Sequence, residues 1–225
     1  MRLLIVSATK FELAPLNHFL GQHFQLNEEG FVSKEGLEIR LLYTGVGMMH
    51  TAYAMGKTLG QTPYDLVINA GIAGAFPERG LSIGDVVNVG TERFGDLGAE
   101  QADGSFADVH EMELIAADQF PFQNGRLVNP GAENQSFLPL AHGLTINKVH
   151  GHAKSIENIR AKYDVDIETM EGAAFFFACL QEQQAFLEIR AISNHVESRN
   201  KDNWDIPLSI NNLNTTLLQM VESFL

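Results

Sequence analysis

The segment 169–174, Thr-Met-Glu-Gly-Ala-Ala, places a carboxylate at the head of an apolar stretch that predicts a helix over 173–180. Glutamate is rarely buried without a partner, so Glu171 needs a physical reason to stand there. Two reasons are open. The helix dipole stabilises a carboxylate in the first turn, or the carboxylate binds the hydroxyl groups of a ligand.

Arg190 lies in the middle of an apolar segment, 186–193, that predicts a buried strand. A buried guanidinium needs carboxylate partners, and Glu12 and Glu171 are the acids available if the ends of the strands converge. Asn194 follows at the end of the same strand, where an amide is also common as a turn residue.

Glu12 has a local explanation as well. Its spacing from Thr9 permits a capping box, in which Thr9 begins a helix that runs to about Leu20 with Glu12 in the first turn. On residue types alone this explanation competes with a role for Glu12 in chemistry.

Apolar strands alternate with helices along the chain, which predicts an α/β fold with a mostly parallel sheet covered on both faces. Ligands of such sheets collect where strands end and glycine turns begin, as expected at 44–47 and 70–75. The stretch 92–135 has a weak pattern and is predicted to be mostly loop, with one helix at 111–118. The other predicted strands are 3–7, 37–43, 65–69, 84–89, 144–149 and 166–168, and the other helices are 48–59, 154–163 and 207–224.

The 225 residues are 45% hydrophobic and carry a net charge of −13. One sizeable core, and hence a single domain over 1–225, is the expectation. An acidic surface repels nucleic acid and anionic membrane, which favours a small-molecule partner. The single cysteine, Cys179, is expected to be a buried packing residue, and the short apolar N-terminal run to be a strand and no signal peptide, so a cytoplasmic protein is predicted.

Three common kinds of site are disfavoured by their spacing. The turn Gly45-Val46-Gly47 lacks the third glycine of a dinucleotide fingerprint, since His50 stands there. His150 and His152 have no accompanying metal-ligand motif, and no Gly-x-Ser-x-Gly elbow is present. We therefore expect neither a metal nor an organic cofactor.

Six segments follow one another in an order and spacing that are specific together: 8–12, 44–47, 69–74, 84–87, 168–174 and 190–193. Through them the chain resembles the nucleoside phosphorylase and nucleosidase family over essentially its whole length. This resemblance implies an α/β/α sandwich around a central mixed sheet, and a homo-oligomer, most often a dimer. Within the family, 193–199 together with Trp204, Pro207 and 211–214 is similar to the branch that hydrolyses futalosine.

The resemblance also implies roles for individual residues in cleaving a ribose–purine bond. Glu12 would polarise the attacking water, Glu171 would accept hydrogen bonds from the ribose hydroxyls, and Arg190 would hold the carboxylates and the water in register. Met170 would pack against the sugar, and Phe94 is a candidate to stack on the base. The implied substrate-binding residues are Ala73, Gly74, Met170, Phe94, Thr169 and Ser193.

The identity of the substrate is expected to follow from two positions. Glu12 would repel a phosphate, which favours hydrolysis over phosphorolysis. Asn194 stands where adenine-releasing relatives carry an aspartate, and a neutral amide suits the N7 and O6 acceptors of hypoxanthine. A 6-oxopurine nucleoside is therefore expected, which agrees with the futalosine hydrolysis that the resemblance implies. The alternatives are a methylthioadenosine/adenosylhomocysteine nucleosidase, a purine nucleoside phosphorylase and a non-catalytic binding module. The carboxylate of futalosine calls for a cation, and the candidates are His50, Arg93, His110 and Lys154.

Overall fold

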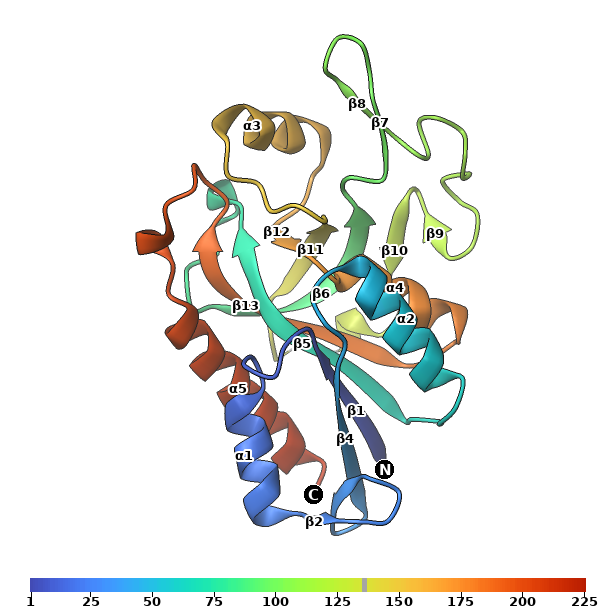
Figure 1. The fold of residues 1–225 in the computed structure, drawn as a ribbon, viewed down its shortest axis with the longest axis vertical. Coiled ribbons are helices and arrows are strands. Elements are labelled where there is room, and N and C mark those ends of the chain that lie inside the picture. The colour runs from blue at the N-terminus through green and yellow to red at the C-terminus, as the bar shows by residue number, and fades with distance from the viewer. Residues whose placement is uncertain (135–136) are drawn as a thin grey trace.

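The computed structural model of the protein describes residues 1–134 and 137–225, and it shows a central mixed sheet between two layers of helices (Figure 1). The helices are α1 (Ala14–His23), α2 (Met48–Leu59), α3 (Ala153–Lys162), α4 (Gly172–Gln181) and α5 (Ile206–Ser223), with short 3-10 turns η1 (Pro77–Arg79), η2 (Ala132–Asn134) and η3 (Lys201–Asn203). The longer strands are β1 (Arg2–Ser7), β4 (Leu37–Tyr43), β5 (Leu66–Ala75), β6 (Val86–Phe94), β11 (Leu140–Thr145) and β13 (Phe186–His195). The short strands are β2 (Gln25–Leu26), β3 (Val32–Lys34), β7 (Gly98–Glu100), β8 (Phe106–Asp108), β9 (Phe122–Gln123), β10 (Arg126–Val128) and β12 (Ile167–Thr169).

The sheet brings the ends of distant strands together. Its strands follow the order β2-β3-β4-β1-β5-β12-β11-β6-β10-β9, and β13 pairs with both β5 and β6. β1 runs parallel to β4 and β5, and β13 runs parallel to β5, whereas β12 is antiparallel to β5 and β13 is antiparallel to β6. The expected α/β/α sandwich around a mixed sheet is confirmed, although the sheet is less parallel than the alternation of elements predicted.

Helices cover the sheet on both faces (Figure 1). α2 and α4 pack on each other over one face, and α1 and α5 pack together over the other. Under α4, the ring of Phe186 lies 5.6 Å from that of Phe175 and 4.8 Å from that of Phe176. Each fully buried side chain of this size contributes about 1.5–3 kcal/mol, so the apolar sequence of α4 fixes that helix to the sheet.

Several predicted elements are confirmed within about one residue. They are β1, β4, α2, α3, β12 and α5, and β13 extends two residues past its predicted end. α5 begins where its sequence indicates, because the side chain of Asp205 accepts a hydrogen bond from the backbone N of Leu208 at 3.0 Å and Pro207 stands in the first turn. Cys179 is buried, as predicted. No helix within 1–134 and 137–225 combines the length and the apolar character that crossing a membrane requires.

The start of the first helix was predicted wrongly. α1 begins at Ala14, with Pro15 in its first turn, and Glu12 lies in the turn before the helix instead of inside it. Thr9 does not cap α1. Its hydroxyl and its backbone N both donate to the Glu12 carboxylate, at 2.8 and 3.0 Å, so the two residues are in contact outside the helix, with Thr9 as the donor in both hydrogen bonds.

The predicted glycine turn at 70–75 is wrong, because β5 continues through it to Ala75. Its glycines serve close approach of neighbouring side chains, as described below. The helix predicted at 111–118 is also absent. Glu113 has a left-handed backbone (φ +58°), and the Asp108 carboxylate accepts hydrogen bonds from two successive backbone N–H groups, which holds the segment in turns.

Two strand positions differ from those predicted. β6 runs over 86–94 instead of 84–89, and β11 over 140–145 instead of 144–149. Both strands pair with each other in parallel through a register shift at Ala141/His142, which the sequence does not reveal. The loop predicted for 92–135 contains β7, β8, β9 and β10, and its last residue, Gln135, lies outside the described residues.

Candidate active site

Gly71 allows three distant segments to meet. Arg190 on β13 stands directly opposite Gly71 on β5. A Cβ at Gly71 would overlap the Nη1 of Arg190 and would lie 2.8 Å from the Oε1 of Glu12. The missing side chain therefore provides the space in which the guanidinium of β13 approaches the carboxylate that follows β1.

The Glu12 carboxylate is buried and fixed by donors from two strands and a turn. Its Oε2 accepts hydrogen bonds from the Ser7 hydroxyl at 2.9 Å and from the hydroxyl and backbone N of Thr9. Its Oε1 accepts a longer bond, 3.3 Å, from the backbone N of Ile72. Three donors on one oxygen leave the other as the atom with spare accepting capacity, which suits an acceptor for a water proton.

Glu171 stands at the N-cap of α4, and the N-terminus of α2 holds its carboxylate. Its Oε1 accepts a 2.8 Å hydrogen bond from the backbone N of Gly47, whose own φ of +96° only glycine adopts readily. Burial raises the pKa of Glu171, the charge of Arg190 and the Gly47 bond oppose that rise, and the charge of Glu12 adds to it. The two sequence-predicted carboxylates thus lie close enough to affect each other.

The nearest acid to Arg190 is Glu188, which the sequence interpretation missed. The Nε of Arg190 donates to the Oε1 of Glu188 at 2.7 Å, and both side chains are fully buried. Burial alone would lower the pKa of Arg190, but the charges of Glu188, Glu171 and Glu12 outweigh it and raise that pKa. A signal was available: residues two apart on a strand share a face, so Glu188 was in position to pair with Arg190.

A second missed acid, Glu92 on β6, lies next to Glu188. The hydroxyls of Thr145 and Thr169 donate to its two oxygens at 2.8 and 3.2 Å. A Cβ at Gly172 would collide with the Glu92 carboxylate and would lie 2.8 Å from the Oε1 of Glu188. Burial, and then the charge of Glu188, raise the pKa of Glu92 well above its ordinary value. No spacing in the sequence indicates this contact, because it depends on the register of β6.

Asn194 lies beside Gly74, near the C-terminal ends of β5 and β13. Its Nδ2 donates to the backbone O of His195 at 3.0 Å, and a Cβ at Gly74 would lie 3.1 Å from that nitrogen. The Ser193 hydroxyl lies 2.8 Å from the Asn194 Oδ1 and 3.2 Å from the backbone O of Ala73. The structure therefore groups Ala73, Gly74, Ser193 and Asn194 at one place, two to three residues along β5 from the Gly71 contact.

The other predicted substrate-binding residues, Met170, Thr169 and Phe94, have different surroundings. Met170 is half-buried and directly precedes Glu171. Thr169 is buried, and its hydroxyl is engaged by Glu92 and, at 3.0 Å, by Thr145, so it supports the strand under Glu171. Phe94 ends β6 and packs 6.2 Å from the ring of Phe122, among partly buried apolar side chains. Direct contact of these residues with a substrate stays a prediction.

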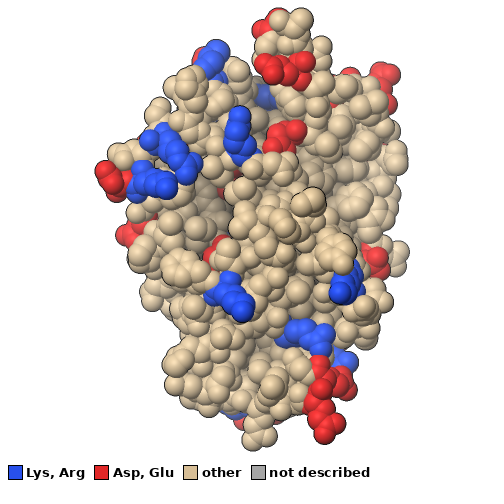
Figure 2. Space-filling model, viewed as in Figure 1, with Lys and Arg blue, Asp and Glu red and all other residues tan. Residues whose placement is uncertain are grey.

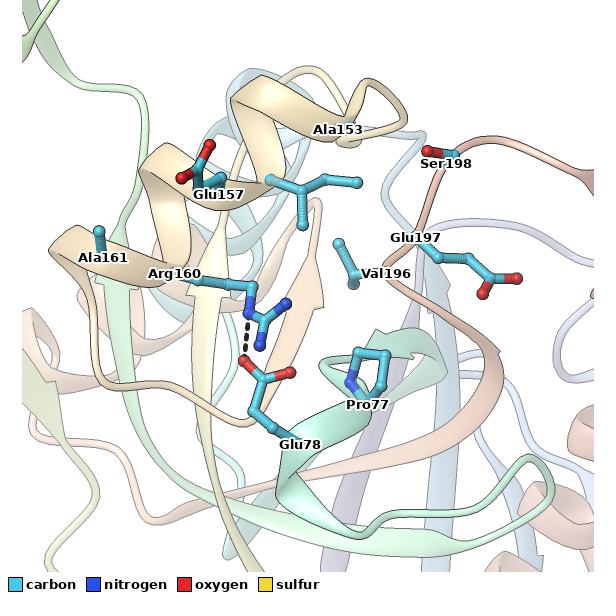
Figure 3. A pocket seen from close by; sticks show the side chains of 10 residues that line it. Pro77, Glu78, Ala153, Glu157, Arg160, Ala161, Val196, Glu197 and Ser198 are labelled. Carbon is cyan, nitrogen blue, oxygen red and sulfur yellow. Dashed lines mark ion pairs between the residues drawn. The ribbon is translucent and has the colours of Figure 1, made fainter.

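A surface cavity of about 590 Å³ lies between α3, η1 and the segment after β13 (Figure 3). It borders the Asn194 end of the sheet, since Val196 lines it and also lies against Gly74. In Figure 3 the side chains of Arg160 and Glu78 point toward each other across its lower rim, where they form an ion pair. The cavity lining includes neither Glu12 nor Glu171.

The histidines considered as metal ligands, and the cations considered for the 5′ side of a nucleoside, are each held by local contacts. His150 binds the Glu168 carboxylate through its ring, and His142 binds the Thr91 hydroxyl at 2.9 Å. Within the part of the chain that the structure describes, no three His, Cys, Asp or Glu side chains are grouped as metal ligands. The ring of His50 binds the backbone O of Val46, Lys154 pairs with Glu157 on exposed α3, and Arg93 and His110 both lie against Gly125.

Comparison with known proteins assigns nearly the whole chain to one family. Residues 2–225 match the Phosphorylase superfamily. The futalosine hydrolase of Thermus thermophilus is 32% identical over 165 residues, which are 72% of this chain and 72% of that protein. The 5′-methylthioadenosine/S-adenosylhomocysteine nucleosidase of Bacillus velezensis is 30% identical over 165 residues, 72% of this chain and 70% of that protein. The solved structure of the futalosine hydrolase of Helicobacter pylori aligns with a TM-score of 0.77 and 17% identity, over 99% of this chain and 98% of that chain. The chain belongs to the Phosphorylase superfamily.

Proposed function

We propose that this hydrolase of N-glycosidic bonds acts on futalosine, releasing hypoxanthine and dehypoxanthinyl futalosine as a step of menaquinone biosynthesis in the cytoplasm. The observation that carries the proposal is that Glu12 and Arg190 meet at Gly71, that Glu171 lies close enough for both of their charges to affect its pKa, and that the neutral Asn194 lies beside Gly74 on the same strand. Similarity to the Thermus thermophilus futalosine hydrolase supports it.

The chemistry follows from the charge that develops on the sugar. Breaking a ribose–purine bond passes through an oxocarbenium-like transition state, as glycoside cleavage does. Glu12 takes the proton of the attacking water through its less occupied Oε1. Glu171, anchored by Gly47, accepts hydrogen bonds from the ribose hydroxyls and places negative charge near the cationic sugar. Met170 packs against the apolar side of the sugar.

Arg190 keeps these acids together, and the Glu12 carboxylate favours water over phosphate as the nucleophile. Its guanidinium faces Glu12 and Glu171 from within the core and does not open outward as a phosphate-binding arginine would. A phosphate in the place of the water would meet the Glu12 carboxylate at contact distance. Two unit charges at 4 Å repel by about 4 kcal/mol at an effective dielectric of 20, which disfavours phosphorolysis.

Asn194 favours a 6-oxopurine as the leaving base. One hydrogen of its Nδ2 goes to the backbone O of His195, and the other is free to reach N7 or O6 of hypoxanthine, which both accept hydrogen bonds. Ala73, Gly74 and Ser193 border the same space, and the absence of a side chain at Gly74 gives the base room against β5.

Replacing Asn194 by Asp should lower kcat/KM on hypoxanthine nucleosides by about 10–100-fold, because a carboxylate then faces two acceptors of the base without a proton to share. The same change should harm hydrolysis of methylthioadenosine less, since adenine offers an amino group to the carboxylate. Steady-state kinetics on both substrates measure this. Asn200→Asp is the matched control, since Asn200 is exposed and its Oδ1 accepts from a backbone N as a carboxylate would. Unchanged kinetics on futalosine in Asn194→Asp would remove Asn194 from the base site.

One assay separates the candidate functions. The protein is incubated with futalosine, inosine or methylthioadenosine, with and without inorganic phosphate, and the released base is identified by chromatography. Release of hypoxanthine from futalosine at a rate independent of phosphate supports the proposal. A phosphate requirement would indicate a phosphorylase instead.

A methylthioadenosine/adenosylhomocysteine nucleosidase is the second candidate. The observation in its favour is the 30% identity to the Bacillus velezensis enzyme, close to the identity with the futalosine hydrolase. Asn194 opposes it for the reason given above. Adenine as the preferred product in the assay would establish this candidate and would reject the first.

We also propose that the protein works as a homo-oligomer, with a dimer as the expected form. Figure 2 shows a largely uncharged area over the first half of α2. Val46, just before the helix, is 50% exposed, and Met49 and Tyr53 in the helix are 74% and 73% exposed, an unusual grouping of large apolar side chains on one part of the surface. Sedimentation velocity should show a dimer that Met49→Glu weakens, and a monomer at all concentrations would contradict the proposal.

A further inference from the structure

The core beside the candidate active site holds more acid than the reaction needs. Glu92 and Glu188 are both completely buried, and they join Glu12 and Glu171 around the one guanidinium of Arg190. Full ionisation would set four carboxylates against one cation in a region that excludes water. Desolvating an unpaired charge costs several kcal/mol, so this state is strongly disfavoured.

Glu188 determines which way Arg190 faces. The two residues are two apart on β13, so their side chains share the face covered by α2 and α4. Because the rigid guanidinium gives its Nε edge to Glu188, at 2.7 Å, its Nη1 lies over Gly71 beside Glu12. The second oxygen of Glu188 has no hydrogen-bond partner in the described part of the chain, so the contact with Arg190 is what holds this carboxylate.

Glu92 has different partners. Its oxygens accept from the hydroxyls of Thr145 and Thr169, and no ion pair joins it to a cation within the described residues. Hydroxyl groups satisfy a neutral carboxylic acid as well as a carboxylate, whereas Glu188 has the cation contact that an ionised group needs. Burial and the charge of Glu188 raise the pKa of Glu92 well above its ordinary value, which agrees with this division.

We propose that Glu188 is the positioning residue of Arg190, and that Glu92 is the protonated, neutral member of the buried set. The inference rests on the proposed function, since its effect on turnover is exerted through Glu12 and Glu171. The ionised Glu188 balances part of the Arg190 charge. The remainder keeps Glu12 and Glu171 in place without suppressing the basicity that water activation requires.

The titratable and charged groups that face Glu188 come from each element packed around it. Three of them are acids: Glu92 on β6, Glu12 in the turn before α1 and Glu171 at the head of α4. α4 also contributes the Cys179 thiol, whose pKa is raised by burial and then by the charge of Glu188. β13 contributes the Arg190 guanidinium.

The first test is Glu188→Gln. The amide oxygen still accepts from the Nε of Arg190, so the geometry is kept while the compensating charge is lost. Arg190 then favours the ionised form of the carboxylates it faces more strongly. We expect kcat on futalosine to fall about tenfold with little change in KM, and the acid side of the kcat–pH profile to move to lower pH.

The matched variant is Glu92→Gln, which replaces one neutral group by another of the same shape. The acid side of its kcat–pH profile should coincide with that of the parent chain. If the acid side of the profile moved equally in the two variants, the protonated state of Glu92 would be rejected. A profile whose acid side moves in neither variant would reject Glu188 as the anion that balances Arg190, because a residue that only supports the structure changes stability and not the pH profile.

The second test needs no turnover. The infrared spectrum of the parent protein at pH 7.5 should contain the C=O stretch of a protonated carboxyl group, and this band should be missing from Glu92→Gln. An identical spectrum in that region would overturn the protonated state even if Glu188→Gln failed to fold. Absence of turnover in the parent would count against the proposed function alone, because the infrared result does not depend on it.

Discussion

Replacing Glu12 by Gln is expected to lower kcat for nucleoside hydrolysis by about 10²–10⁴-fold, the usual contribution of general base catalysis. An amide cannot take the proton of the attacking water. It also disturbs the local bonding, since the Ser7 and Thr9 donors all point to one oxygen and the Ile72 N–H and Arg190 face the other. Whichever way the amide turns, the carbonyl can satisfy only one side. KM should change much less, because Glu171 and the base site are untouched.

Pre-steady-state and steady-state assays on futalosine measure this effect. Glu222→Gln, at the exposed end of α5, is the control and should retain parental kinetics. Parental kcat in Glu12→Gln would mean that the water is activated by another group, with Glu171 as the next candidate. Loss of binding with unchanged kcat would instead assign Glu12 to substrate binding.

Segments with a clear period and a clear boundary could be predicted from the sequence. α2 ends at a glycine and carries a regular apolar stripe, and α5 begins at an Asp-x-Pro start signal. The run over 186–193 could be assigned to a buried strand because most of its residues are apolar. In each case a feature of the local sequence is enough to predict the element that the structure shows.

Glycine was misread where it serves side-chain contact. Gly71 and Gly74 stand inside β5, and both make room for residues of β13, Arg190 and Asn194. In a sequence, a strand interrupted by glycines looks like a strand that ends in a turn. The pairing partner determines which of the two occurs, and β13 lies more than a hundred residues away.

The candidate site was predicted in its outline and incompletely in its charges. Glu12, Glu171 and Arg190 were expected together, and the structure brings them together. The pairing of Arg190 with Glu188 was open to strand-period reasoning. Glu92 was not, since only the register of β6 against β11 brings it under the Thr145 and Thr169 hydroxyls. Buried charge networks of this kind depend on topology that local sequence does not contain.

Arg190→Met should destabilise the fold by about 3–5 kcal/mol at neutral pH, the usual consequence of removing one partner of a buried ion pair. Methionine fills much of the same volume, so the loss is mainly electrostatic. Glu188 would lose its hydrogen-bonded cation, and Glu171 and Glu12 would lose the charge that offsets their burial. Catalysis should be lost together with this stability, since the two carboxylates proposed for catalysis then lose the cation that holds them in register.

The pH dependence of this loss identifies its cause. Without Arg190, the buried carboxyl groups acquire folded-state pKa values above those of the unfolded chain. The native state then binds more protons than the unfolded state, so stability relative to the parent rises as pH falls and decreases as pH rises. Urea unfolding at pH 5 and pH 7.5 should therefore show a smaller difference between Arg190→Met and the parent at pH 5. Arg160→Met, which breaks the partly exposed pair with Glu78, is the control and should cost at most about 1 kcal/mol at either pH. Equal, pH-independent losses in the two variants would mean that Arg190 acts by packing alone, and that Glu12 and Glu171 do not depend on its charge.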